Sequence, residues 1–138
     1  MGRKRRLGKL GELQLAILQV LWEHGPCSVA DIHRRLRGRK LAYTTVATML
    51  RKMEARGLVH HTVEDRRFIY HAAVDAEQAR RSAVQDLVRR YFQGDVTAAV
   101  CNLLDIADVT PEELKELEEL IARYRRRSSQ ESEDESGA

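Results

Sequence analysis

The spacing of apolar residues changes at Gly57, and this change constrains the fold more than any other feature of the sequence. Before Gly57, apolar residues recur every three or four positions, which is typical of amphipathic helices. After it, residues 58–63 and 68–71 are rich in β-branched and aromatic side chains, which is typical of strands. The polar residues 64–67 between these runs predict a hairpin turn. Three helices followed by a hairpin form the element order of a winged helix-turn-helix.

The three helices have recognisable ends. The first is expected at about residues 11–23, before a Gly-Pro pair that stops it. The second follows the capping residue Ser28 and ends near Gly38. The third is expected at about residues 42–56, with Gly57 as a left-handed C-terminal cap.

Beyond the hairpin the sequence again indicates helices, over residues 75–94, 96–104 and from the start signal Thr110-Pro111 onward. The fold class is therefore mainly α with a small β hairpin: a winged helix-turn-helix followed by an α-helical region. The polar acidic end is expected to be disordered. The predicted organisation is a basic N-terminal arm (1–9), a winged-helix domain (10–74), a helical domain (75–127), whose expected role in dimerisation is argued below, and a disordered acidic tail (128–138).

The third helix carries the candidate functional face. Tyr43, Val46, Leu50 and Met53 follow at steps of three and four, which predicts one buried face. The opposite face holds three threonines, which are poor helix formers because their branched side chains lose rotamer freedom. A threonine hydroxyl can donate or accept, and its methyl group can pack on a thymine methyl in the major groove. The predicted base contacts are Thr44, Thr45 and Thr48, although the same threonines could simply form a solvated face.

Basic charge gathers around this helix. The chain through His71 holds 15 Lys and Arg against 6 Asp and Glu, whereas the rest holds 9 against 15. Each basic run alone is more often solvation than contact, but their convergence on one helix is the footprint of a DNA reader. The predicted DNA backbone contacts are Lys40, Tyr43, Arg51, Lys52, Arg66 and Arg67, and those of the arm are Arg3, Lys4, Arg5 and Arg6.

Four segments carry a family resemblance: LGELQLAILQVLWEHG, VADIHRRL, LAYTTVATMLRKMEARGLV and RRFIYHAAV. Together they resemble the penicillinase-repressor family of bacterial transcription regulators, the BlaI/MecI type, and the likeness extends to about Arg126. AYTTV is its most specific part. The resemblance implies a homodimeric winged-helix repressor that binds a dyad-symmetric operator in double-stranded DNA and blocks transcription.

The C-terminal helices fit a dimer physically. They display more apolar positions than a small three-helix layer can cover, and such exposed stripes usually mark an interface. An isologous dimer is the simplest closure, and a helical cap on the winged helix of the same chain is the alternative. The predicted dimer interface consists of Leu87, Tyr91, Val100, Leu103, Leu104, Leu114, Leu117, Leu120, Ile121 and Tyr124.

The resemblance also implies a way to end repression. In relatives that control β-lactam resistance, a membrane-bound sensor metalloprotease triggers cleavage within the dimerisation helices, at an Asn followed by a large apolar residue. Asn102-Leu103 matches in position, with Leu103 where those relatives carry Phe. The alternative is that Asn102 is only a polar position beside core leucines.

Several other functions are disfavoured. The sequence has no Gly-rich phosphate loop, HExxH or nucleophile elbow, so we expect no enzyme. Cys27 and Cys101 are too few for a disulfide framework or a four-thiolate metal site, which favours the reducing cytoplasm. Of three hairpin histidines (His60, His61 and His71), at most two can converge, because His60 and His61 face opposite sides. We therefore expect no metal and no cofactor.

The apolar run after the basic start does not predict membrane insertion. It is interrupted by polar residues at helical spacing and is shorter than the span of about 20 residues that a bilayer requires. The remaining rival to a sequence-specific repressor is a winged helix that contacts proteins, or that binds nucleic acid without sequence preference.

Overall fold

The computed structural model of the chain describes residues 9–36 and 40–136. It divides into two compact units, with the division between Arg89 and Arg90. Arg3, Lys4, Arg5 and Arg6 of the expected arm lie outside the described residues.

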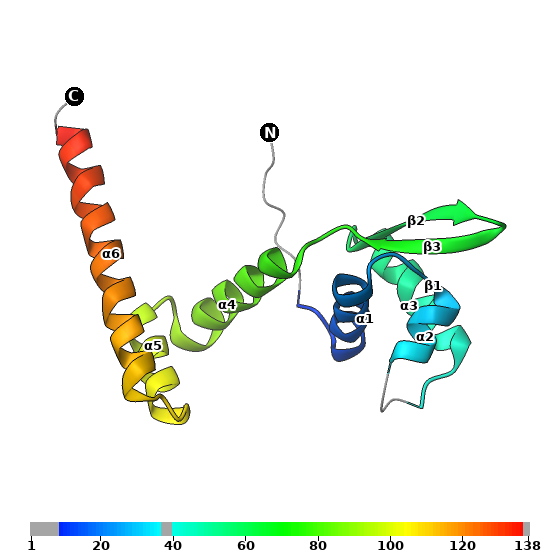
Figure 1. The fold of residues 1–138 in the computed structure, drawn as a ribbon, viewed down its shortest axis with the longest axis horizontal. Helices are drawn as coiled ribbons and strands as arrows, with labels where there is room; N and C mark the ends of the chain where they lie inside the picture. Colours follow the sequence, from blue (N-terminus) through cyan, green and yellow to red (C-terminus); the bar gives the residue numbers. More distant parts are fainter. Residues whose placement is uncertain (1–8, 37–39, 137–138) are drawn as a thin grey trace. The chain divides into compact units, whose positions relative to one another are not determined.

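The first unit contains three helices, a small sheet and most of a fourth helix (Figure 1). This element order confirms the winged helix-turn-helix, and the hairpin forms its wing. The elements are α1 (Glu12–His24), β1 (Cys27–Ser28), α2 (Val29–Arg35), α3 (Tyr43–Ala55), β2 (Val59–Glu64), β3 (Arg67–Ala72) and α4 (Ala76–Phe92).

The sheet is antiparallel with the strand order β1-β3-β2. The wing is the β2–β3 hairpin, in which His61 lies opposite Tyr70 and Glu64 lies opposite Arg67. At its base, β3 also pairs with β1, where Cys27 lies opposite Tyr70. The short strand β1 was not predicted from the sequence, because two residues show no periodicity.

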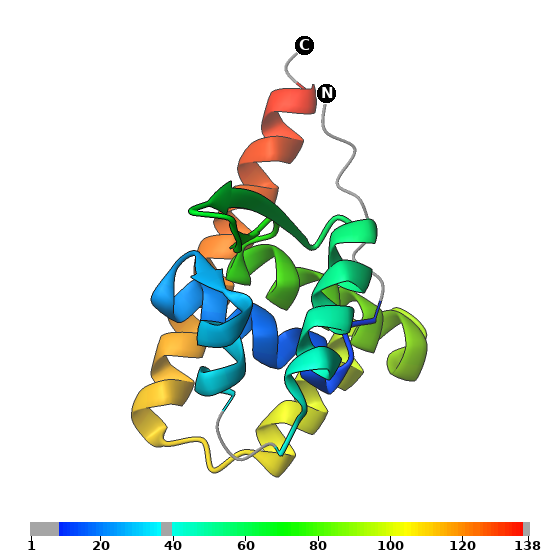
Figure 2. The ribbon, with the colours of Figure 1, turned by 90° about the vertical axis from the view of Figure 1, so that its right-hand side faces the viewer.

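The core of the first unit lies where α1, α2, α3 and the base of the wing meet (Figure 2). Val46, Leu50 and Met53 bring one face of α3 into this core and are fully buried. Tyr43 does not join them, because it is the first residue of α3 and its side chain is 49% exposed. The prediction that Tyr43 belongs to the buried face is therefore wrong.

The end of α3 directs the chain into the wing. Gly57 has φ +77°, a left-handed conformation that glycine adopts without steric cost. Its N–H donates to the Glu54 carbonyl, and the N–H of Leu58 donates to the Met53 carbonyl at 2.9 Å. These two bonds form the Schellman motif, so the predicted C-terminal cap is confirmed.

The second unit holds the end of α4 and two further helices. Asp95 caps one of them by accepting from the Ala98 N–H, and Thr110 caps the other by accepting from the Glu113 N–H at 3.1 Å. Both helix starts therefore lie where the sequence places them. The helices are α5 (Val96–Ile106) and α6 (Pro111–Ser136).

The end of the last helix differs from the expected one. The segment 128–138 was expected to be disordered, but α6 continues through it to Ser136. Gly and Pro are absent between Pro111 and Gly137, and Glu and Gln favour helix, so nothing in this sequence stops α6 earlier. The two compact units divide within α4, whereas the predicted winged-helix domain, 10–74, ends before α4 begins and stays a prediction.

The chain leaves the wing close to α1. The indole N–H of Trp22 donates to the Val74 carbonyl at 2.9 Å, which ties the approach to α4 to the winged-helix core. Ala79 on α4 is also buried. These contacts explain why the first turns of α4 belong to the first compact unit.

Candidate nucleic-acid interface

The outer face of α3 carries the three threonines predicted to read bases. Thr44, Thr45 and Thr48 are all exposed, whereas Val46 and Leu50 hold the helix from beneath. Because threonine side chains are short, the helix backbone could approach the floor of a major groove closely. The predicted separation of this face from the core is therefore confirmed, except at Tyr43.

The start of α3 is fixed by α2. The Nε2–H of His33 donates to the Leu41 carbonyl at 2.6 Å, and the His33 ring meets the edge of Tyr43 with centroids 6.1 Å apart. Ser28 accepts from the Asp31 N–H at the start of α2. The Ser28 side chain also lowers the pKa of Asp31, and the positive charge of Arg34 acts in the same direction.

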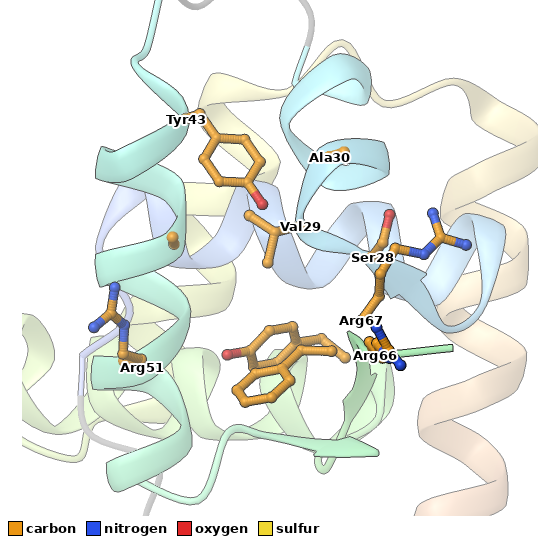
Figure 3. A pocket seen from close by; sticks show the side chains of 10 residues that line it. Ser28, Val29, Ala30, Tyr43, Arg51, Arg66 and Arg67 are labelled. Carbon is orange, nitrogen blue, oxygen red and sulfur yellow. The ribbon is translucent and has the colours of Figure 1, made fainter. Parts of the chain in front are cut away.

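A hollow of about 390 Å³ lies between α2, α3 and the wing (Figure 3). Its apolar lining includes Val29 from α2, Ala47 from α3, and Phe68 and Tyr70 from the wing. Burial raises the pKa of Tyr70, and the charge of Glu54 adds to this effect, so the Tyr70 hydroxyl keeps its proton.

Three arginines give the hollow its charge. Arg51 lies on α3, across the hollow from Arg66 and Arg67 on the wing, and all three are exposed (Figure 3). The described residues that line the hollow include no Asp or Glu. An anionic group such as a DNA phosphate is therefore the favoured occupant of this rim.

The tip of the wing carries arginine where glycine is easier to accommodate. Asp65 and Arg66 have φ of 48° and 66°, the left-handed values that a two-residue hairpin turn requires. Asn and Gly are the residues that adopt such turns at least cost. Arg66 therefore holds an energetically costly backbone conformation at an exposed tip.

The structure brings together some of the predicted backbone contacts and not others. Tyr43, Arg51, Arg66 and Arg67 all line the hollow. Lys40 and Lys52 are exposed but do not line it.

The apolar walls of the hollow were not predicted from the sequence. The alternation of side chains along the hairpin could have placed Phe68 and Tyr70 on one face. The position of Val29, in contrast, depends on how α2 packs and has no signal of its own in the sequence.

The hairpin histidines lie on two faces. His60 stacks on His71 with ring centroids 4.8 Å apart, whereas His61 stacks on Phe68. The three rings therefore do not converge, as the alternation of the strand predicts.

The C-terminal apolar residues are unburied within a single chain. All ten residues predicted for the dimer interface are exposed, among them Leu103 and Tyr124 at 57% and 58%. Asn102 is exposed on α5, and its side-chain amide donates to the Ala98 carbonyl at 3.4 Å. The Asn102-Leu103 bond thus lies inside a helix.

In the part of the chain that the structure describes, no helix is both long enough and apolar enough to cross a membrane. Three packed helices, a wing and a basic face define a winged helix-turn-helix protein of the DNA-binding regulator class.

Comparisons with known proteins agree with this class. The family model described as penicillinase repressor matches residues 10–123. The penicillinase repressor of Bacillus licheniformis is 20% identical over 127 residues, which cover 91% of this chain and 99% of that protein. The transcriptional regulator BlaI of Mycobacterium tuberculosis is 37% identical over 67 residues, 47% of this chain and 49% of that protein.

A solution structure of Bacillus licheniformis BlaI, a monomeric form in complex with the blaP half-operator, is also similar. It aligns with a TM-score of 0.45 and 22% identity, covering 51% of this chain and 87% of that chain. By the family match over most of its length, the chain belongs to the penicillinase-repressor family. The resemblance carried by the four sequence segments is thereby confirmed.

Proposed function

We propose that this protein is a homodimeric transcriptional repressor that binds a dyad-symmetric operator in the cytoplasm. In this proposal α3 enters the major groove, where Thr44, Thr45 and Thr48 contact base edges. Tyr43, Lys40, Lys52 and the arginines of the hollow contact the backbone, together with the basic N-terminal arm. The observation that carries the proposal is an exposed threonine face that adjoins a hollow with three arginines at its rim.

Base reading and backbone binding can be separated by substitution. Replacing all three threonines by Ala removes hydroxyl and methyl contacts without a charge change, so preference for the operator over unrelated DNA should fall by about tenfold or more. Competition binding with labelled operator measures this preference. Thr97→Ala on α5 is the matched control, because Thr97 is exposed but lies outside the proposed interface.

Arg51→Ala or Lys52→Ala should act differently. Each should weaken binding to all sequences and reduce the slope of log affinity against log salt by about one, if each residue contacts a phosphate. An unchanged operator preference in the threonine variant would favour the rival function, a winged helix that binds proteins or DNA without sequence preference. An unchanged salt slope would refute the phosphate contacts.

The homodimer is supported by the ten exposed apolar residues of α4, α5 and α6. Large exposed apolar stripes on a single chain are costly in water unless another surface covers them. A dimer would hold two copies of α3 at a separation of about one or two turns of DNA, at roughly 34 Å per turn.

Release from the operator would follow from cleavage at Asn102-Leu103, triggered through a membrane sensor metalloprotease. Proteases bind extended chain, so α5 must unwind locally around this bond before cleavage. Asn102→Pro would remove this bond as a substrate but would also break α5, and a charge at Leu103 would disturb the proposed dimer interface. Asn102→Ala keeps the helix and should slow cleavage, so it is the better test. A digest with the cognate protease that spared the bond in the unaltered protein would reject this route.

A further inference from the structure

One cluster of side chains joins α3 to the wing. Nδ1 of His61, on β2, lies 2.5 Å from Oε1 of Glu54, on α3. The His61 ring also stacks on Phe68, on β3, with centroids 4.1 Å apart and planes at 13°. We call Glu54, His61 and Phe68 the helix–wing cluster.

The cluster lies where the wing leaves the core. At the base, Val59 and Tyr70 are buried and β1 pairs with β3, so the wing is firmly held there. Farther out, Val63 and Phe68 are 62% and 47% exposed, and the hairpin consists of two strands alone. A two-stranded ribbon has little stability of its own and twists readily. The bond from His61 to Glu54 is thus a side-chain restraint close to the free part of the wing.

The cluster adjoins the arginines of the hollow. Phe68 follows Arg67 directly in β3, and both line the hollow whose opposite side carries Arg51. Phe68 is held against His61, and His61 is held against Glu54. These two contacts fix β3, the strand that carries Arg67, relative to α3. The spacing between the wing arginines and Arg51 therefore depends on a contact that includes none of them.

The contact joins a ring nitrogen that can donate to a carboxylate oxygen that accepts, so it links β2 to α3 directly. Both side chains are about one third exposed, at 29% and 33%, so the bond is partly shielded from water.

We propose that Glu54 and His61 are positioning residues for DNA binding. They hold the wing so that its arginines and those of α3 reach the phosphates of one operator site together, without touching DNA themselves. This inference rests on the proposed function. Prealigned cationic groups lose less conformational freedom on binding, which is the benefit that the cluster would provide.

The charge of Glu54 makes the inference sharply testable. Glu54 is an acid on the DNA-binding helix, so its removal alone should strengthen binding to a polyanion. The positioning role predicts the opposite result. We expect Glu54→Ala and His61→Ala each to weaken operator binding about threefold to tenfold, at the low end of the effects seen for coupled contacts. Glu54→Gln, which keeps an acceptor, should lose less.

A double-substitution cycle provides the readout that a merely structural role would not change. Arg67→Ala alone should weaken binding. The same substitution should weaken binding less when His61→Ala is already present, because Arg67 in a misaligned wing no longer reaches its phosphate. His60→Ala is the matched control: His60 lies on the same strand but on the opposite face, stacked on His71, and should bind like the unaltered protein. Unfolding midpoints of all variants identify any that fail to fold, in which case Glu54→Gln and His61→Gln replace them.

The inference is overturned if Glu54→Ala binds the operator as tightly as the unaltered protein or more tightly. It is also overturned if Arg67→Ala has the same effect with and without His61. These results would leave the proposed function intact, because the unaltered protein would still bind its operator. Failure of the unaltered protein to prefer any sequence would instead reject the proposed function, and the inference with it.

Discussion

Leu50 and Arg51 are neighbours in sequence but lie on different faces of α3, one buried and one exposed. Leu50 is fully buried among α1, α2 and the base of the wing, whereas Arg51 is exposed at the hollow. The helical period of 3.6 residues separates the two side chains, so the core can hold the proposed DNA-binding face in place without sharing residues with it.

Leu50→Ala should destabilise the protein without touching the proposed DNA contacts. Removing a fully buried leucine side chain costs about 2–5 kcal/mol of unfolding free energy, through lost burial and the cavity left behind. Denaturant unfolding of the full chain measures this. Lys52→Ala on the exposed face should change stability by less than about 0.5 kcal/mol, and an equal loss in both variants would contradict the assignment of faces.

At the scale of single residues, the sequence predicts the faces of α3 well because burial follows helical spacing. It fails at Tyr43, because spacing does not show where the packed part of a helix begins. Neither does spacing show which polar side chains meet across elements, so the bond between Glu54 and His61 had no signal in the sequence.

Among the elements, the wing combines a firmly packed base with a conformationally costly tip. Arg66 holds a left-handed conformation that disfavours residues with a Cβ atom. Arg66→Gly should therefore stabilise the hairpin turn by about 1 kcal/mol in unfolding free energy. The same change removes a proposed phosphate contact, so DNA binding should weaken and the salt slope should fall by about one.

Opposite changes in stability and DNA binding are the expected signature of Arg66→Gly. Thermal unfolding and DNA titrations at several salt concentrations provide the two readouts. Asp65→Gly is a useful comparison. It relieves the steric cost of the left-handed backbone at residue 65, where φ is 48°, without removing a positive charge. A gain of stability with unchanged DNA affinity in Arg66→Gly would show that the wing tip does not contact DNA.

Most elements were predictable because each has a strong local signal. The change of period at Gly57 locates the wing, and the Thr110-Pro111 start locates α6. The strand β1 is too short to show alternation and forms only because β3 lies beside it. The continuation of α6 to Ser136 was not predicted, because a polar composition shows only that a segment does not pack into a core. Such a segment can still form a solvent-exposed helix.

For the whole molecule, the proposed repressor requires a second copy of the chain. Leu117 and Ile121 lie one turn apart on α6, and both are exposed in the single chain. Leu117→Glu would place a charge in the proposed dimer interface and should convert dimers to monomers, since a buried unpaired charge costs several kcal/mol. Sedimentation measures the oligomeric state.

The matched control for Leu117→Glu is Lys115→Glu, which introduces the same side chain at an exposed polar position of α6. It should leave the dimer intact. A monomeric unaltered protein would contradict the dimer and favour the alternative, in which the C-terminal helices cap the winged helix of their own chain.

The charge of the molecule is also unevenly divided, with the excess of Lys and Arg before His71 and that of Asp and Glu after it. Polyanionic DNA is therefore attracted to the winged-helix part, and its affinity must depend steeply on salt. Any measurement of sequence preference has to be made at physiological salt, because low salt favours binding to all DNA.

The most direct test of sequence-specific repression is to recover the fragments of the source genome that the purified protein binds at physiological salt. The account predicts a shared dyad-symmetric sequence near a promoter, with half-sites about one or two helical turns apart. Bound fragments without a common sequence would contradict it, because they would show that Thr44, Thr45 and Thr48 do not read bases.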